Sequence, residues 1–193
     1  MTDHWLQTDE REDVITSLAM LDVSLNQVEK DVAAWKWVVI ATHSALQSAI
    51  GFHLRTGNNF LVAKQEDAKA WLRAHEEGTP YPEMMMDRFP NLYRKLKQNE
   101  IEGFKFVPHG SQGPSIKKIN KFRNEFIHFM PKGWSIEISG MPRICIDCLD
   151  VVVELDENTL HRRWEDENQR TRFRMFVTSC LSKLNQLEHE YDT

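Results

Sequence analysis

The sequence predicts an all-α protein that folds as a single-domain helical bundle over residues 1–193. In nearly every long segment, apolar residues return at steps of three and four, which is the period of an α-helix. Alternation with the period of a strand is limited to the short stretch 133–140. A chain of 193 residues with 41% hydrophobic residues can bury one core, whereas two full domains would leave too little for either.

Two helices are expected at the start of the chain, over about 14–29 and 31–54. The first follows an acidic lead-in, which suits a helix N-terminus, and it has one apolar stripe. The stripe consists of Val14, Leu18, Leu21, Leu25 and Val28. The second helix is apolar on most sides and ends at the stop signal T-G-N-N, so we expect it at the centre of the bundle.

A long insertion, irregular in part and helical in part, is expected over about 56–113, between the second and third core helices. It contains an amphipathic helix over 64–77 and one or two short helices around Pro90. The stretch G-F-K-F-V-P-H-G-S-Q-G-P follows, and its three glycines and two prolines indicate irregular structure. We interpret the insertion as an excursion from the core and not as a second domain.

Three further core helices are expected after the insertion. One covers about 115–130, with Pro114 near its start. Another opens at Met141, and the last covers about 167–190. The run 161–174 mixes charges of both signs and indicates a solvated helix start.

The helix expected over 115–130 carries two stripes. At about 100° per residue, five apolar side chains fall on one side, which is the predicted core contact. They are Ile116, Ile119, Phe122, Phe126 and Phe129. A polar stripe lies roughly opposite, and it consists of Lys117, Lys121, Asn124 and His128. Arg123 lies on the flank, about 140° from His128 around the axis, so the spacing favours a site formed by two copies across a two-fold axis.

The charge around this helix differs from that of the whole chain. The formal net charge of -5 and the pI near 5.9 argue against a protein that coats nucleic acid along its whole surface. Near the polar stripe, in contrast, five cations are opposed only by Glu125, so an anion such as a phosphate would bind favourably. The cations are Lys117, Lys118, Lys121, Arg123 and Lys132.

These residue types fit cleavage of an RNA phosphodiester bond without a metal. His128 could move a proton to or from the 2'-hydroxyl or the leaving 5'-oxygen, because an imidazole ordinarily titrates near neutrality. Arg123 could hold the charge that builds on the phosphoryl oxygens. Asn124 could orient the phosphate or the imidazole.

Further residues near this helix are candidates for binding RNA. Lys117, Lys121 and Lys132 would contact phosphates. Trp134, which follows the turn P-K-G, could stack on a nucleobase at the edge of the site or cover the end of the bundle. A solvated helix face would also account for the polar spacing, so the spacing alone leaves both interpretations open.

Other classes of protein fit the sequence less well. The acidic N-terminus lacks the basic and apolar regions of a signal peptide, so a cytoplasmic protein is expected. Lys36, His43 and Gln47 interrupt the apolar run 32–50, which favours a core helix over a membrane span. The segment C-I-D-C, at 145–148, lacks a second pair of ligands, so we expect reduced core thiols and neither a metal nor a cofactor.

The segment R-N-E-F-I-H, from Arg123 to His128, resembles the motif of the HEPN domains (higher eukaryotes and prokaryotes nucleotide-binding). Ribonucleases of this family carry Arg, a polar residue and, after three further residues, His on a late core helix of a helical bundle. As here, that helix follows a variable insertion and lies beside an upstream apolar helix. The resemblance covers the order of helices, and specific identities are confined to the segment around the motif.

The resemblance implies a homodimer in which Arg123, Asn124 and His128 of both subunits line one cleft. It implies a metal-independent endoribonuclease that leaves 2',3'-cyclic phosphate ends and acts as a toxin or antiphage effector, with RNA and an antitoxin protein as partners. Toxins of this family that are silenced by nucleotide transfer carry Tyr where this chain has Met130. Other relatives lack catalysis, so the alternative is a silent module that dimerises or binds a nucleotide or a protein partner.

Overall fold

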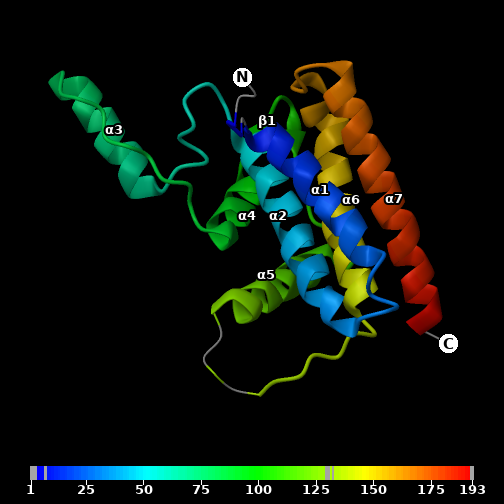
Figure 1. The fold of residues 1–193 in the computed structure, drawn as a ribbon. Helices are drawn as coiled ribbons and strands as arrows, with labels where there is room; N and C mark the ends of the chain where they lie inside the picture. Colours follow the sequence, from blue (N-terminus) through cyan, green and yellow to red (C-terminus); the bar gives the residue numbers. More distant parts are fainter. Residues whose placement is uncertain (1–3, 7, 129–130, 132, 192–193) are drawn as a thin grey trace.

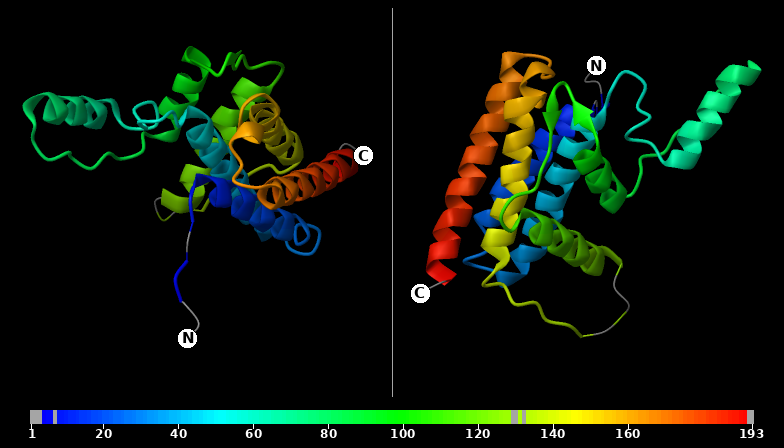
Figure 2. Two further views of the ribbon diagram at one scale, coloured as in Figure 1. Left: turned by 90° about the horizontal axis from the view of Figure 1, so that it is seen from above. Right: turned by 180° about the vertical axis from the view of Figure 1, so that it is seen from behind.

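The computed structural model describes residues 4–6, 8–128, 131 and 133–191, and it confirms the predicted all-α fold. Helix α1 packs along α2 and α7, and α6 packs against α2, α5 and α7, while α5 crosses the other helices (Figure 1 and Figure 2). The bounds of these helices are α1 Glu10–Leu25, α2 Trp35–Leu54, α5 Gln112–His128, α6 Met141–Asn158 and α7 Glu167–Tyr191. Short 3-10 turns, η1 (Val32–Ala34) and η2 (Leu160–Arg162), lie before α2 and after α6.

Helix α1 begins and ends about four residues earlier than the apolar stripe alone suggested. It begins at Glu10 and not near Val14, because the Asp9 carboxylate caps it by accepting two backbone N–H groups of the first turn. It ends at Leu25, and residues 26–30 form a turn. The stripe identified the buried face correctly but carried no information about the cap.

Helix α2 lies at the centre of the bundle, as its apolar composition predicted. Most of its side chains are buried, and Val38, Leu46 and Ile50 have no exposed surface. In the described part of the chain, none of the helices combines the length and the hydropathy needed to cross a membrane.

The insertion between α2 and α5 consists of an arm and a segment that belongs to the core. Helix α3 (Gln65–Glu77) projects from the body (Figure 1 and Figure 2), and an antiparallel bridge between Ala63 and Met86 closes its base. Helix α4 (Phe89–Gln98) packs against α2 instead. Its side chains in the main core are Phe89, Leu92, Tyr93 and Leu96. The expected excursion therefore applies to α3, whereas α4 is part of the core because its apolar face has α2 to pack on.

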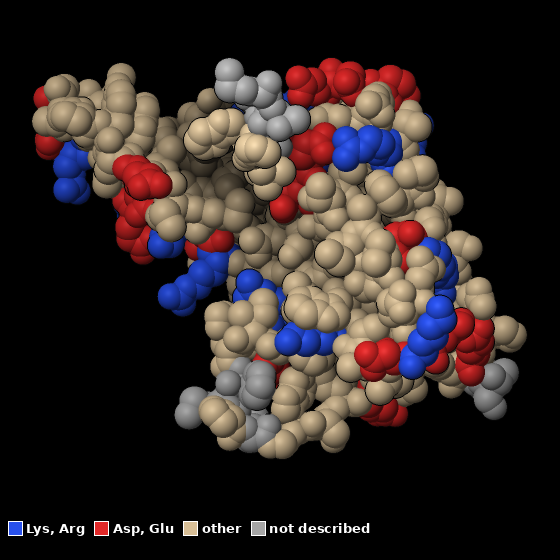
Figure 3. Space-filling view, viewed as in Figure 1, with Lys and Arg blue, Asp and Glu red and all other residues tan. Residues whose placement is uncertain are grey.

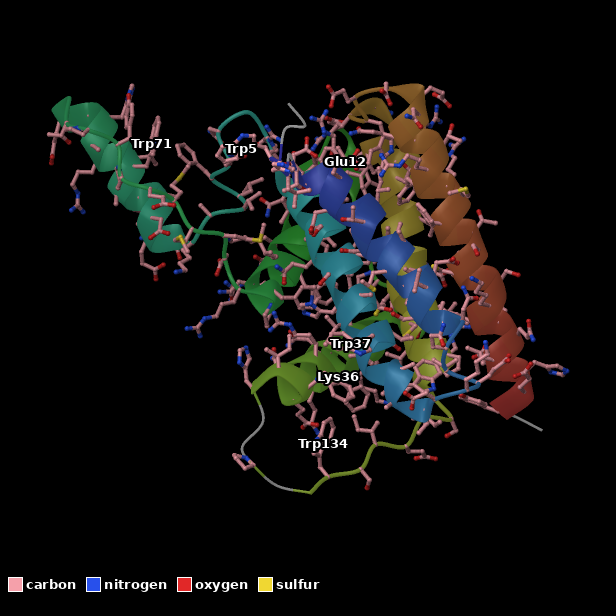
Figure 4. The ribbon with its side chains drawn as sticks, viewed as in Figure 1. Trp5, Glu12, Lys36, Trp37, Trp71 and Trp134 are labelled. Carbon is pink, nitrogen blue, oxygen red and sulfur yellow. The ribbon has the colours of Figure 1, made fainter. Side chains whose placement is uncertain are left out.

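Stacked aromatic rings hold the arm together. Trp71, labelled in Figure 4, stacks on Tyr81 with 4.2 Å between ring centroids and an interplanar angle of 7°. The Tyr81 hydroxyl lies 3.0 Å from His75 Nδ1, and Phe60 meets the Trp71 ring edge-on. These contacts give α3 a small core of its own.

A tight hairpin follows α4. Strand β1 (Glu100–Ile101) pairs antiparallel with β2 (Phe104–Lys105). The two residues that join them, Glu102 and Gly103, have φ values of 55° and 82°, which suits a two-residue hairpin turn. The turn places Glu102 beside Arg163. The Nη2 atom of Arg163 donates a hydrogen bond to the Glu102 carboxylate at 2.6 Å.

Arg163 caps the C-terminal end of α2. Its Nη1 donates to the carbonyl oxygens of Phe52, His53 and Arg55 at 2.9, 2.9 and 3.1 Å. The last carbonyls of a helix have no partner within the helix, and the guanidinium supplies one. The solvated face predicted for the run 161–174 is therefore wrong for Arg163, whose side chain is only 16% exposed.

Replacing Arg163 by alanine is expected to lower the free energy of unfolding by about 2–4 kcal/mol, because buried carbonyls lose a charged donor. Equilibrium unfolding in urea measures this change. Arg162→Ala is the matched control, because Arg162 is the exposed neighbour, and it should cost less than about 0.5 kcal/mol. Equal losses in the two variants would contradict the capping role.

Candidate functional site

Helix α5 carries the two predicted stripes. Ile116 and Ile119 are buried, and Phe122 and Phe126 are half-buried against the core. The side chains of the polar stripe are exposed, and they are Lys117, Lys121, Asn124 and His128. Phe129, the last member of the predicted apolar stripe, lies outside the described residues.

One side of α5 opens onto a pocket of about 560 Å³, which Arg123, Asn124 and His128 border together. Its other walls come from α2 and from the returning end of the insertion. The remaining lining residues are His43, Gln47, Met86, Asp87, Arg88, Phe89, Pro90 and Asn120. The fold thus brings the predicted catalytic residues together within one chain, in a pocket large enough for a small ligand.

Arg123 is bound by its neighbour in sequence. Its Nη1 donates a hydrogen bond to Asn124 Oδ1 at 3.1 Å. Arg123 lies on the flank of α5 relative to His128, and the length of its side chain brings it to the shared pocket. A guanidinium has five N–H donors, so the bond to Asn124 leaves donors for an anion.

His43 and Asn120 form a wall of the pocket. His43 is 2% exposed, and its Nε2 lies 3.2 Å from Asn120 Oδ1. Because an amide oxygen only accepts, Nε2 carries the hydrogen. Burial lowers the pKa of His43 to about 4. The positive charge of Arg123 also lowers this pKa, whereas the hydrogen bond to Asn120 raises it. His43 is therefore neutral at neutral pH and orients Asn120.

Asn120 is a site residue that the sequence pattern could have revealed. It lies one helical turn before Asn124 and two turns before His128, on the same side of α5. Asp87 and Arg88 had no comparable signal, because they belong to a different segment that only the fold brings to α5.

Asp87 fixes the wall that the insertion contributes. Its carboxylate accepts hydrogen bonds from the Arg88 backbone at 2.8 Å, from Asn91 Nδ2 at 2.7 Å and from Lys95 Nζ at 2.8 Å. Burial by itself would raise the pKa of Asp87, but these bonds and the Lys95 charge outweigh burial and lower it. The ionised carboxylate holds the segment that lines the pocket at a fixed position.

Cations lie on the pocket and along the helix that borders it. Arg88, Lys117 and Lys121 are exposed, and the contact of Lys121 with Glu125 is long, at 3.9 Å. A solvent-exposed ion pair contributes little, so an anion could replace it. Figure 3 shows Lys and Arg side chains where α4 approaches α5, whereas Asp and Glu side chains are seen on the arm, at the upper ends of the helices and near the C-terminal end of α7. Lys132, a predicted phosphate contact, lies outside the described residues.

Trp134 lies on the other side of α5 from this pocket. Its ring is 4.9 Å from that of Phe126 between centroids, and both line a different pocket. Phe126 and Asn124 are two positions apart, which is about 200° around a helix. The structure therefore does not bring Trp134 to the pocket of Arg123 and His128.

The cysteines are buried and free. The core position predicted for Cys145 and Cys148 is confirmed, and Cys180 is buried as well. Burial raises the pKa of the Cys145 and Cys180 thiols to about 12, which suppresses the thiolate form. Among the described residues, no group of three or more His, Cys, Asp or Glu side chains is placed to hold a metal ion.

The fold and the pocket define an all-α protein in which two arginines, two asparagines and two histidines line one cavity, beside the exposed lysines of α5. Compared with protein-family models, with curated proteins and with solved structures, the chain gives no match. The observations that point to a function are therefore the chemistry of this cavity and the presence of Arg123, Asn124 and His128 in its lining.

Proposed function

We propose that this protein is a metal-independent endoribonuclease that acts as a homodimer, with Arg123, Asn124 and His128 in its active site. The supporting observation is that these three side chains border one pocket. An arginine with donors to spare suits an anionic phosphodiester, and an adjacent imidazole suits proton transfer. The cellular role that accompanies this activity in the proteins it resembles is that of a toxin or antiphage effector under the control of an antitoxin.

In the proposed reaction, the 2'-hydroxyl oxygen of a nucleotide loses its proton and attacks the adjacent phosphorus. The bond from phosphorus to the 5'-oxygen of the next nucleotide breaks, and that oxygen gains a proton. His128 carries one of these proton transfers, and Arg123 stabilises the charge on the phosphoryl oxygens. Asn124 positions the guanidinium. The products are a 2',3'-cyclic phosphate and a 5'-hydroxyl.

A second copy of the chain completes the site in this proposal. Within the residues that the structure describes, His128 has no hydrogen-bond partner to orient its ring. Its neighbour Ile127 is 42% exposed, so its apolar side chain is available for contact with a second copy. Across a two-fold axis, the second α5 would cover Ile127 and bring a second Arg123 towards His128.

A catalytically silent module that dimerises or binds a nucleotide is the second candidate. The unoriented ring of His128 and the net charge of -5 favour it, because both fit a surface that binds a small partner and not a long RNA. In that case Arg123→Ala would change binding or association, and RNA would stay intact.

Purified protein incubated with mixed RNA in excess EDTA is expected to cut the RNA and leave 2',3'-cyclic phosphate ends. His128→Ala, purified in parallel, should leave the RNA intact, whereas His189→Ala, at an exposed histidine of α7, should cut like the wild type. Intact RNA with the wild-type protein would contradict the proposal. Cutting that survives His128→Ala would point to a contaminating nuclease or to a different active site.

A further inference from the structure

We propose that a second pocket, on the opposite side of α5, binds a small organic anion with a planar aromatic body. The pocket has a volume of about 450 Å³, which lies in the usual range for small-molecule sites. It lies between the start of α2 and residues 134–138, which precede α6. Its lining residues are Val32, Ala33, Trp35, Lys36, Phe126, Trp134, Ile136, Ile138 and Met141.

Aromatic rings form fixed walls for the apolar body of such a ligand. Trp134 packs on Phe126 with an interplanar angle of 58°, so the two rings meet at a corner. Trp35 is 2% exposed, and its Nε1 donates to the Tyr191 hydroxyl at 3.1 Å, which ties this wall to the end of α7. Flat rings on two sides favour a planar apolar group between them.

Lys36 determines the charge of the ligand. It is the only charged side chain among the described residues that line the pocket, so no carboxylate there competes for it. Its Nζ lies 5.0 Å from the centre of the Trp37 ring, and no ion pair joins it to a described residue. Figure 4 shows Lys36 and Trp37 near the start of α2. Trp134 lies below α5 in the same view. A carboxylate or sulfonate at Lys36 would form a charge-assisted hydrogen bond.

The pocket is separate from the one that contains His128. Phe126 lies between Asn124 and His128 in sequence but points to the opposite side of α5. Binding here can therefore be measured directly, without reference to cleavage of RNA.

Isothermal titration calorimetry with 1-naphthoate and with its neutral analogue 1-naphthamide tests the proposal. The wild-type protein should bind both, and the carboxylate more tightly by about tenfold, because only the carboxylate forms a hydrogen bond to Lys36 in which both partners are charged. Lys36→Met should remove this preference and leave 1-naphthamide binding unchanged. Trp134→Ala should weaken the binding of both ligands, because the substitution removes one wall of the pocket.

Lys30→Met is the matched control, because Lys30 is a nearby exposed lysine that does not line the pocket. It should leave the affinity for 1-naphthoate unchanged. The absence of saturable binding to the wild type would overturn the proposal. Equal losses in Lys30→Met and Lys36→Met would also overturn it, and so would undiminished binding by Trp134→Ala.

Discussion

A mixture of Arg123→Ala and His128→Ala proteins is expected to regain RNA cleavage that neither variant has alone. Loss of a general acid or base costs about 10²–10⁴-fold, and loss of a donor to the transition-state charge costs about 10²–10³-fold. In a dimer of the two variants, the intact Arg123 of one chain would meet the intact His128 of the other. About half of the dimers that form at random are mixed, so a substantial part of the activity should return.

The mixing experiment separates a composite site from a site within each chain. Activity should be measured after the two variants have been denatured and refolded together, so that chains exchange. As a control, each variant is refolded alone, and both should stay inactive. If the mixture stays inactive while refolded wild-type protein cuts RNA, each chain holds a complete site.

Acidification from pH 7 to pH 5 is expected to lower the free energy of unfolding through His43 and His53. Burial lowers the pKa of each from 6.5 to about 4. The charge of Arg123 lowers the pKa of His43 further, and the charge of Arg163 does the same for His53. The Asn120 bond at His43 and the Glu102 charge at His53 oppose the shift. In the unfolded chain each imidazole takes up a proton as the pH falls below 6.5, whereas the folded protein binds it only near pH 4.

Between these two pH values, protonation of the unfolded chain therefore lowers the free energy of unfolding. The loss at pH 5 is about 2 kcal/mol for each histidine. Urea unfolding at a series of pH values measures the change. The double variant His43→Gln/His53→Gln should lose much less stability over this window than the wild type. His189→Gln, at an exposed position, should keep the wild-type dependence. A wild-type slope in the double variant would show that other groups cause the effect.

Much of the architecture could be predicted because it depends on local spacing. Apolar residues at steps of three and four identified the helices and their buried faces, and Val14, Leu18 and Leu21 are all fully buried. The same reasoning placed His128 on the solvent side of α5. Helix ends were less accurate, since the start of α1 depends on the Asp9 side chain and not on the apolar stripe.

The sequence by itself therefore determined the all-α class, the two stripes of α5 and the exposure of His128, because each follows from the helical period along one segment. Only the tertiary structure decided that Asp87 and His43 border the pocket of Arg123, that α4 joins the core, and that Trp134 faces away from His128. It also decided that Arg163 caps α2. These features depend on which distant segments meet, and their contacts gain free energy only when the whole chain has folded.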